Sequence, residues 1–258
     1  MLEHAEFGDP DGLPVLVQPG TPSTGRVGEL LDRTARARGV RLVVVTRPGY
    51  GSVPVTPPGL VSVAEQVGLL ADELGLERFG TWGLSGGGPY ALAQAVATPD
   101  RVARVVVSAG GAPGGPAQTV AELIAEANEL AALFAGLDAQ AFVASRPPTE
   151  LFFRDHPEYA DAFILDLRRG TASPDGHVRD NRSWQGDWDF SLADVRVPVD
   201  LVYGELDQMV PLDHGQRLAD AIPHARLHVL PGSGHGYATF GSVNMVCELF
   251  GGRSGGRP

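Results

Sequence analysis

The stretch that decides the fold is Phe79-Gly80-Thr81-Trp82-Gly83-Leu84-Ser85-Gly86-Gly87. A short apolar run leads into a Gly-x-Ser-x-Gly pattern, and a helical pattern begins at Gly88. Strand, Gly-x-Ser-x-Gly and helix in this order form the layout of a nucleophile elbow, a turn so sharp that it requires glycine on both sides of the serine. The turn places the Ser85 hydroxyl at a helix N-terminus, where free N–H groups favour developing negative charge. The pattern therefore predicts that Ser85 is a nucleophile.

The same pattern occurs a second time, at Gly252-Arg253-Ser254-Gly255-Gly256. No strand precedes it and no helix follows it, and its polar, Gly/Arg-rich composition predicts a disordered tail over 251–258. The context thus selects Ser85 over Ser254. The alternative for Ser85 is a serine that only caps a helix.

The composition excludes several kinds of function. All 20 basic residues are arginine, which excludes a Walker lysine, a Schiff-base lysine and a Ser–Lys dyad. The net charge of −11 argues against nucleic acid or an anionic membrane surface as a partner. The single cysteine, Cys247, excludes an internal disulfide and a Cys-pair metal site, and we expect it to be buried and inert.

No apolar run approaches the roughly 18 residues of a membrane span. The first nine residues are polar and mixed, unlike the apolar core of a signal peptide. We therefore expect a soluble, cytoplasmic protein with a small-molecule substrate. The sequence does not indicate an oligomeric state.

Strand and helix patterns alternate through the first 110 residues. The expected strands are short apolar runs, and the expected helices show apolar residues at helical spacing. The strands are 15–17, 42–45, 79–82 and 105–107, and the helices are 27–38, 63–74 and 88–96. Continuous apolar runs are typical of strands buried on both faces, so we predict a mainly parallel sheet with helices on both faces.

The alternation stops after residue 110. Residues 111–190 contain no convincing strand, and helical patterns cover about 117–135, 138–145 and 157–169. Strands at 199–203 and 226–230 and helices at 214–221 and 243–250 then resume the alternation. We expect a core of residues 1–110 and 191–250, with 111–190 inserted as a helical lid.

Two loops at strand ends supply partners for a serine nucleophile, which needs a general base and an acid that orients the base. Asp207 follows the strand that ends at Tyr203, and His235 follows the strand that ends at Leu230. Both loops lie at the carboxyl edge of the sheet, as Ser85 does. Glu205 and Asp213 are competing acids, and both Asp207 and His235 could be ordinary loop residues.

At this point the chain resembles the α/β-hydrolase fold superfamily over nearly all of residues 1–250. The matching motifs are Gly-Asp-Pro-Asp-Gly at 8–12, Pro-Gly-Thr-Pro at 19–22, Arg-Pro-Gly-Tyr-Gly at 47–51, the elbow at 83–87, Gly-Glu-x-Asp-x-x-Val-Pro at 204–211 and Pro-Gly-x-Gly-His at 231–235. The resemblance implies a catalytic triad of Ser85, His235 and Asp207. It also implies an oxyanion hole formed by the backbone N–H groups of Gly86 and Thr21.

Two positions depart from the family pattern. Pro19 stands where the family usually has histidine, and Thr46 stands where an acidic residue usually begins the loop after the strand. Tyr50, Phe134 and Trp184 are candidate substrate contacts, with structural packing as the alternative for each. The lid aromatics Phe134, Phe142, Phe152 and Phe153 fit a lid core better than substrate contacts. The other histidines lack metal-ligand spacing, and we expect no metal and no cofactor.

The predicted chemistry is acyl transfer to water through an acyl-enzyme. Our main hypothesis is a serine esterase for a small, largely apolar carboxylic ester or lactone. The alternatives are a carbon–carbon bond hydrolase or biosynthetic tailoring enzyme of the same fold, or a ligand-binding protein with a near-silent triad. Gly236 and Tyr237 follow His235, whereas carbon–carbon hydrolases often have tryptophan after the histidine. This difference favours the ester hypothesis over carbon–carbon hydrolysis.

Overall fold

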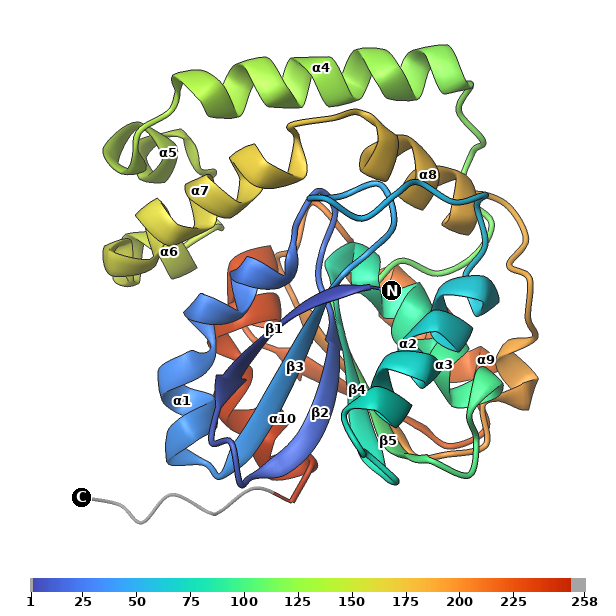
Figure 1. Cartoon of the computed structure of the whole chain (residues 1–258). Coiled ribbons are helices and arrows are strands. Elements are labelled where there is room, and N and C mark those ends of the chain that lie inside the picture. Colours follow the sequence, from blue (N-terminus) through green and yellow to red (C-terminus); the bar gives the residue numbers. More distant parts are fainter. Residues whose placement is uncertain (1, 252–258) are drawn as a thin grey trace.

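The computed structural model describes residues 2–251, so the predicted disordered tail lies, apart from Gly251, outside the described residues. A seven-stranded sheet forms the centre (Figure 1), in the order β1-β3-β2-β4-β5-β6-β7. Only β1 runs antiparallel, to β3, while every other neighbouring pair is parallel. The strands are β1 Glu3–Gly8, β2 Leu13–Gln18, β3 Val40–Thr46, β4 Phe79–Leu84, β5 Val102–Ser108, β6 Val199–Gly204 and β7 Ala225–Leu230.

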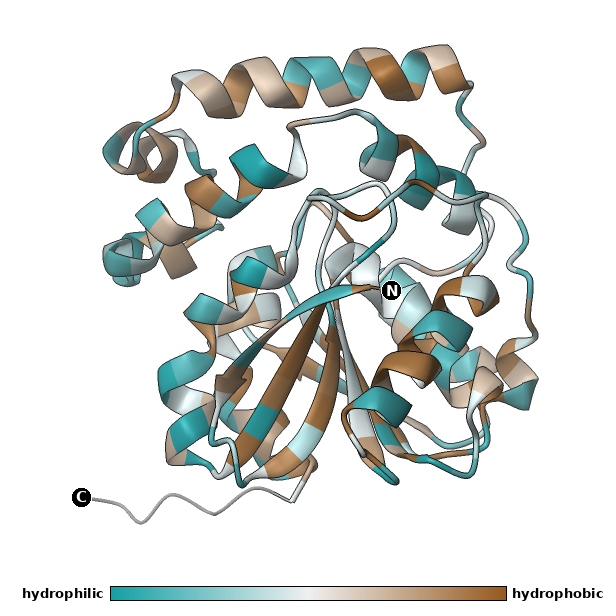
Figure 2. Cartoon of the chain, in the orientation of Figure 1, coloured by the Kyte–Doolittle hydropathy of each residue, from teal (hydrophilic) through white to brown (hydrophobic). Residues whose placement is uncertain are grey.

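The central strands form because their residues are apolar on both faces. Figure 2 shows them as brown arrows inside a shell of mixed helices. Parallel pairing sets Val15 opposite Leu42 and Val106 opposite Asp200. The edge strand β1 was not predicted, because its alternating exposed and part-buried residues carry little apolar signal.

Helices cover both faces of the sheet (Figure 1), as predicted. One face packs on α1 Asp32–Ala37 and α10 Val243–Leu249. The other packs on α2 Val61–Glu73, α3 Gly88–Ala97 and α9 Leu212–Ala221. The α/β fold class predicted from the sequence is confirmed.

The prediction of one helix over 27–38 is wrong. The segment divides into a 3-10 helix, η1 Gly25–Leu30, and α1. A Cβ on Gly28 would lie 2.3 Å from the ring of Phe7, so the tight turn lets the backbone approach β1. Glycine also disfavours a continuous α-helix.

Residues 111–190 contain only helices and loops, and they lie beyond the carboxyl ends of the strands (Figure 1). These helices are α4 Val120–Gly136, α5 Ala139–Ser145, α6 Phe152–Asp155, α7 Ala160–Gly170 and α8 Asp175–Trp184. The remaining short turns are η2 Ser85–Gly87, η3 Pro157–Tyr159, η4 Leu192–Asp194 and the π-helical η5 Tyr237–Gly241. No helix within residues 2–251 combines the length and apolar composition that crossing a bilayer requires.

Helix α8 was missed by the sequence analysis for a physical reason. Its buried side is polar, made of His177, Arg179, Asp180 and Ser183 around Gly176. A search for apolar residues at helical spacing does not detect such a helix.

Candidate active site

The turn after β4 has the sharp geometry that the Gly-x-Ser-x-Gly pattern predicts. Ser85 adopts a φ of 49°, in the left-handed region that non-glycine residues rarely enter. A Cβ on Gly83 would lie 2.6 Å from the carbonyl oxygen of Gly87, and a Cβ on Gly87 would lie 2.1 Å from that of Gln18. Only glycine therefore permits the strand and the following helix to meet at Ser85.

Asp207 and His235 lie together, as the sequence analysis expected. His235 Nδ1 lies 2.7 Å from Asp207 Oδ2, and the Asp207 side chain is fully buried. The other carboxylate oxygen, Oδ1, accepts the backbone N–H groups of Met209 and Val210, both at 2.9 Å. Asp207 is thereby fixed in an orientation that holds the His235 ring.

The two competing acids occupy other places. Glu205 is exposed, and its carboxylate accepts the backbone N–H of Gly232 at 2.8 Å. Asp213 is exposed in the first turn of α9. Neither contacts His235 in the described part of the chain.

Glu150, between α5 and α6, supports the His235 loop and was missed by the sequence analysis. Its carboxylate accepts the backbone N–H of His235 and that of Gly236, the latter at 2.8 Å. Glu150 is nearly buried, at 9% exposure. No sequence motif marks it, because its partners lie 85 and 86 residues away.

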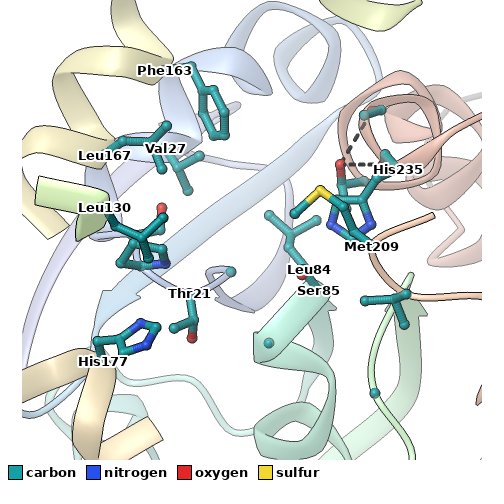
Figure 3. A pocket seen from close by; sticks show the side chains of 18 of the residues that line it. Thr21, Val27, Leu84, Ser85, Leu130, Phe163, Leu167, His177, Met209 and His235 are labelled. Carbon is teal, nitrogen blue, oxygen red and sulfur yellow. Dashed lines mark hydrogen bonds between the residues drawn. The ribbon is translucent and has the colours of Figure 1, made fainter. Parts of the chain in front are cut away.

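A cavity of about 470 Å³ lies between the core and the helices of residues 111–190. Ser85 and His235 both border it (Figure 3), although no hydrogen bond joins them within the described residues. Phe134 and Trp184 also border it. Tyr50 does not: it is buried, and its hydroxyl donates to Asp180 at 3.0 Å, which corrects the expectation of a substrate contact.

The predicted oxyanion loop passes beside Ser85. A Cβ on Gly20 would lie 3.5 Å from the Cβ of Ser85, and a Cβ on Gly86 would lie 2.8 Å from Thr21 Oγ1. Thr21 and Gly86 both border the cavity with Ser85. The backbones of the two expected donors are therefore adjacent at the nucleophile.

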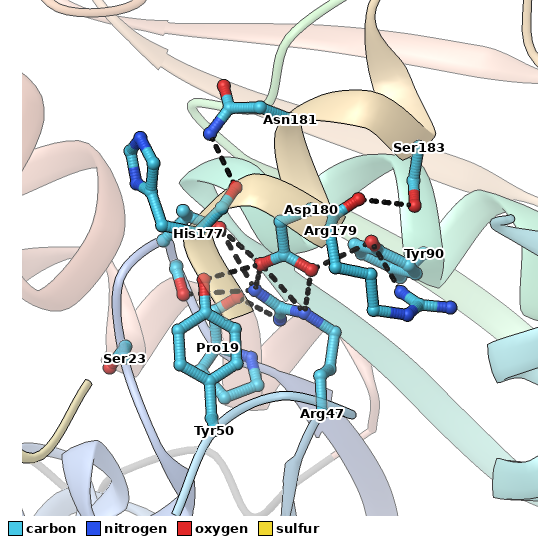
Figure 4. A network of polar contacts seen from close by, with 12 residues as sticks. Pro19, Ser23, Arg47, Tyr50, Tyr90, His177, Arg179, Asp180, Asn181 and Ser183 are labelled. Atoms are coloured by element: carbon cyan, nitrogen blue, oxygen red, sulfur yellow. Dashed lines mark hydrogen bonds and ion pairs between the residues drawn. The ribbon is translucent and has the colours of Figure 1, made fainter. Parts of the chain in front are cut away.

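A fully buried ion pair holds this loop (Figure 4). Arg47, after β3, contacts Asp180 of α8, with Nη2 2.5 Å from Oδ2 and both side chains fully buried. Arg47 also donates to the carbonyl oxygens of Pro19, at 2.5 Å, and Gly20, at 3.1 Å. Asp180 accepts the hydroxyl of Thr21 at 2.6 Å. The Asp180 carboxylate of α8 thus contacts both Arg47 and Thr21 of loop 19–21.

The charges of this network are mutually stabilised. Burial alone would raise the pKa of Asp180, but the positive charge and hydrogen bonds of Arg47 outweigh it, so the pKa lies below its ordinary value. Burial, followed by the negative charge of Asp180, raises the pKa of Tyr90, whose hydroxyl donates to Asp180 at 2.8 Å. Asp180 is therefore an ionised acceptor inside the protein.

Two separate contacts account for the two departures from the family pattern. Arg47 fixes the carbonyl of Pro19, so the loop is anchored without the usual histidine side chain. Thr46 Oγ1 accepts the backbone N–H of Gly25 at 2.9 Å and ties the end of β3 to η1. In the sequence, Arg47 belongs to the Arg-Pro-Gly-Tyr-Gly motif, which does not indicate its partner, and no motif marks Asp180.

The remaining candidate groups have structural partners. His228 lies in β7, as expected, and its Nε2 is 2.7 Å from Asp200 Oδ1. Cys247 is buried, and burial raises the pKa of its thiol to about 12, which agrees with an inert cysteine. Within residues 2–251, no three His, Cys, Asp or Glu side chains cluster as metal ligands would.

Comparison with known proteins agrees with the fold. The model of the alpha/beta hydrolase family matches residues 15–242. A 2-hydroxy-6-oxo-6-phenylhexa-2,4-dienoate hydrolase from Comamonas testosteroni is 26% identical, over 91% of this chain and 85% of that protein. A 2-hydroxy-6-oxononadienedioate/2-hydroxy-6-oxononatrienedioate hydrolase from Pseudomonas putida is 31% identical, over 77% of this chain and 72% of that protein.

Among solved structures, an esterase from Exiguobacterium antarcticum superposes with a TM-score of 0.74 at 20% identity, covering 97% of this chain and 95% of that chain. That likeness concerns the fold. The family match covers most of the residues that form the sheet, the elbow and the Asp207 and His235 loops. The chain belongs to the alpha/beta hydrolase family.

Proposed function

We propose that this hydrolase uses Ser85 as its nucleophile, His235 as its general base and Asp207 as the acid that orients His235. The observation that carries the proposal is the 2.7 Å contact between Asp207 and His235 at a cavity that Ser85 also borders. The strained backbone of Ser85 supports it, since such strain persists where function requires it.

The reaction follows from this arrangement. Ser85 Oγ attacks a carbonyl carbon of the substrate while its proton passes to His235 Nε2. The backbone N–H groups of Thr21 and Gly86 hold the negative oxygen that forms, and the imidazolium is stabilised by ionised Asp207. His235 then gives the proton to the leaving group. A water molecule repeats the sequence and releases the acid.

For the substrate, we place carbon–carbon hydrolysis first, ahead of the ester expected from the sequence. Both relatives named above hydrolyse 2-hydroxy-6-oxo-dienoates, in which a ketone at C6 is conjugated with a dienol acid. Moving a proton to C5 gives a keto group at C2. Attack at C6 then breaks the C5–C6 bond, and the electron pair passes to the C2 oxygen. The products are the acid formed from C6 and a 2-hydroxydienoate.

One observation keeps the ester or lactone as a second candidate. Gly236 stands where carbon–carbon hydrolases often carry tryptophan, and a Cβ there would lie 2.9 Å from the Cβ of Phe152. A large side chain at this position would collide with α6. This chain thus departs locally from the proteins that favour the first candidate.

The test compares the two substrate classes directly. Purified protein is assayed with two substrates in separate reactions. Cleavage of 2-hydroxy-6-oxo-6-phenylhexa-2,4-dienoate is measured as the loss of its conjugated absorbance, and cleavage of p-nitrophenyl butyrate as the release of p-nitrophenol. We expect higher kcat/KM on the dienoate. Higher kcat/KM on the ester would select the second candidate. Binding of either compound without turnover would select the remaining alternative, a ligand-binding protein.

The nucleophile is tested in the same assay. We expect Ser85→Ala to lower kcat by roughly 10³–10⁶, as loss of one triad member does. An organophosphonate probe should label the wild type at Ser85 and leave the variant unlabelled. Labelling at Ser254, or at no serine, would contradict the assignment.

A further inference from the structure

His177 of α8 is a buried side chain on the cavity wall that the proposed reaction does not use. Only 4% of the residue is exposed, and neither ring nitrogen has a hydrogen-bond partner within the described residues. Its ring points away from the Asp180 network (Figure 4) and faces the cavity near Thr21 (Figure 3). Burial of an imidazole without hydrogen bonds costs free energy, which a partner within the cavity would recover.

A second histidine on the cavity wall, His214, differs from His177 because its ring has a hydrogen-bond partner. His214 also borders the cavity, but its Nδ1 accepts the backbone N–H of Ala112 at 2.9 Å. That contact gives His214 a structural role at the start of the lid segment. His177 has no equivalent contact with the main chain.

Glu126 faces His177 across the cavity wall, from α4. Its Oε2 lies 3.6 Å from His177 Nε2, which is too far for a hydrogen bond. Gln118 donates to the same carboxylate oxygen at 3.2 Å and holds it in place. A carboxylate on this side favours the tautomer with the proton on Nε2. Nε2 itself is buried, so an oxygen atom comes within about 2.8 Å of both Nε2 and Oε2, and hydrogen-bonds to each, only when the half-exposed Glu126 side chain moves slightly aside.

We infer that His177 and Glu126 form a subsite for a neutral hydroxyl group of the substrate. A hydroxyl accepts the Nε2–H of His177 and donates to Glu126, so it matches both groups at once. A ketone oxygen only accepts, an ammonium group only donates, and a carboxylate would be repelled by Glu126. The inference rests on the proposed function and narrows its second candidate to esters or lactones that carry a hydroxyl group, because the hydroxyl of a 2-hydroxydienoate lies beside a carboxylate that Glu126 would repel.

The test uses matched esters that differ by one hydroxyl. The panel consists of ethyl 3-phenylpropanoate and its 3-hydroxyphenyl and 4-hydroxyphenyl analogues. We expect kcat/KM of the wild type for one hydroxylated ester to exceed that for the parent ester by about tenfold, the size of one well-made hydrogen bond. His177→Phe should bring this ratio to about one, and His177→Gln, which keeps an N–H donor, should restore part of it.

Glu126 offers a second variant with a matched control. Its side chain is 45% exposed, so Glu126→Gln changes little of the lid packing and should lower the hydroxyl preference. Glu129→Gln makes the same charge change at an exposed position of α4 away from the cavity, and should keep the ratio. Phosphonate labelling of Ser85 checks that each variant is folded.

A binding measurement separates this inference from the proposed function. Trp184 and Trp188 border the cavity, so their fluorescence reports binding of 4-phenylbutan-2-one and 4-(4-hydroxyphenyl)butan-2-one to Ser85→Ala. A hydroxyl preference that His177→Phe removes supports the subsite even if no ester is cleaved. The subsite is overturned, even if Ser85 proves to be the nucleophile, by the absence of a hydroxyl preference in wild-type turnover and in binding to Ser85→Ala, or by a preference that survives His177→Phe.

Discussion

Asp207 binds the His235 ring with one carboxylate oxygen and two backbone N–H groups with the other. The two oxygens therefore contact different groups: Oδ1 accepts from the loop backbone and Oδ2 lies beside Nδ1 of His235. In such a triad the acid keeps the proton on Nδ1, which leaves Nε2 free to accept the serine proton. Replacing Asp207 by Asn therefore removes the negative charge beside His235 and keeps the shape of the side chain.

We expect Asp207→Asn to lower kcat by about 10⁴, because the amide stabilises the wrong tautomer of His235. The carbonyl of Asn still accepts from the loop, so the thermal midpoint should change little. Glu205→Gln is the matched control, since the Glu205 carboxylate accepts the backbone N–H of Gly232 and does not contact His235 in residues 2–251. Equal losses in the two variants, measured by steady-state kinetics, would refute the assignment.

Glycine-rich turns mark two of the proposed catalytic residues in the sequence. Ser85 and His235 each lie in a glycine-rich turn directly after a strand, so local backbone constraints mark them. Glu150 and Asp180 carry no such mark, because they act through partners that lie far away in the sequence. Tyr50 was misassigned for the related reason that its motif fixes the turn but not the direction of the side chain.

Among the helices, α8 docks on the core through charge rather than apolar packing. Asp180 meets Arg47, Thr21, Tyr50 and Tyr90 in a site that excludes water. Removing one partner of a buried ion pair leaves the other charge uncompensated. The fold and the oxyanion loop consequently depend on the same carboxylate.

We expect Asp180→Asn to lower the free energy of unfolding by about 3–5 kcal/mol, the cost of an unpaired buried charge. It should also lower kcat, because the amide keeps only one acceptor oxygen and no charge, so that Arg47 and Thr21 hold loop 19–21 less firmly. Asp175→Asn, at an exposed position of the same helix, should cost less than about 1 kcal/mol. Denaturant unfolding with kinetics at a permissive temperature checks both, and a variant as stable as the wild type would contradict the prediction.

Helix α7 docks through a different carboxyl. Asp166 is buried and accepts the hydroxyls of Ser23 and Thr24. Burial raises its pKa to about 6 against the hydrogen bonds that lower it. The folded protein therefore holds the proton more tightly than the unfolded chain. The resulting stabilisation is complete below about pH 4 and is lost as the pH rises through about 6.

The expected result is that the wild type loses about 3 kcal/mol of unfolding free energy relative to Asp166→Asn between pH 4 and pH 7. Asp161→Asn, an exposed change on α7, should leave the wild-type pH dependence intact. Urea unfolding across this pH range is the measurement. A difference between wild type and Asp166→Asn that stays constant with pH would exclude the role of Asp166.

In the molecule as a whole, the cavity lies between the core and the inserted segment of residues 111–190. The core contributes Ser85 and His235, and residues 111–190 contribute the opposite wall, including Phe134 and Trp184. In enzymes, a segment that covers an active site can exclude water and shape the substrate pocket. We therefore propose that the inserted segment sets substrate choice while the core sets the chemistry.

Phe134→Ala should shift relative kcat/KM toward longer acyl chains, since the ring borders the cavity and one methylene is worth about 1–3 kcal/mol in such a pocket. Leu133→Ala, on the exposed side of the same helix, should leave the relative values unchanged. A series of p-nitrophenyl esters of increasing chain length provides the measurement. The proposal fails if Phe134→Ala scales all esters equally while phosphonate still labels Ser85.

By itself, the sequence determined the α/β alternation, the position of the inserted helical segment and the turns that carry Ser85, Asp207 and His235. These features depend on short-range apolar runs and on glycine at close backbone approaches, which are local properties. Only the tertiary structure decided how the oxyanion loop is held, which helix buries polar residues and which side chains border the cavity. Arg47 and Asp180 are 133 residues apart, and their pairing is set by the docking of α8 on the core, which no local pattern encodes.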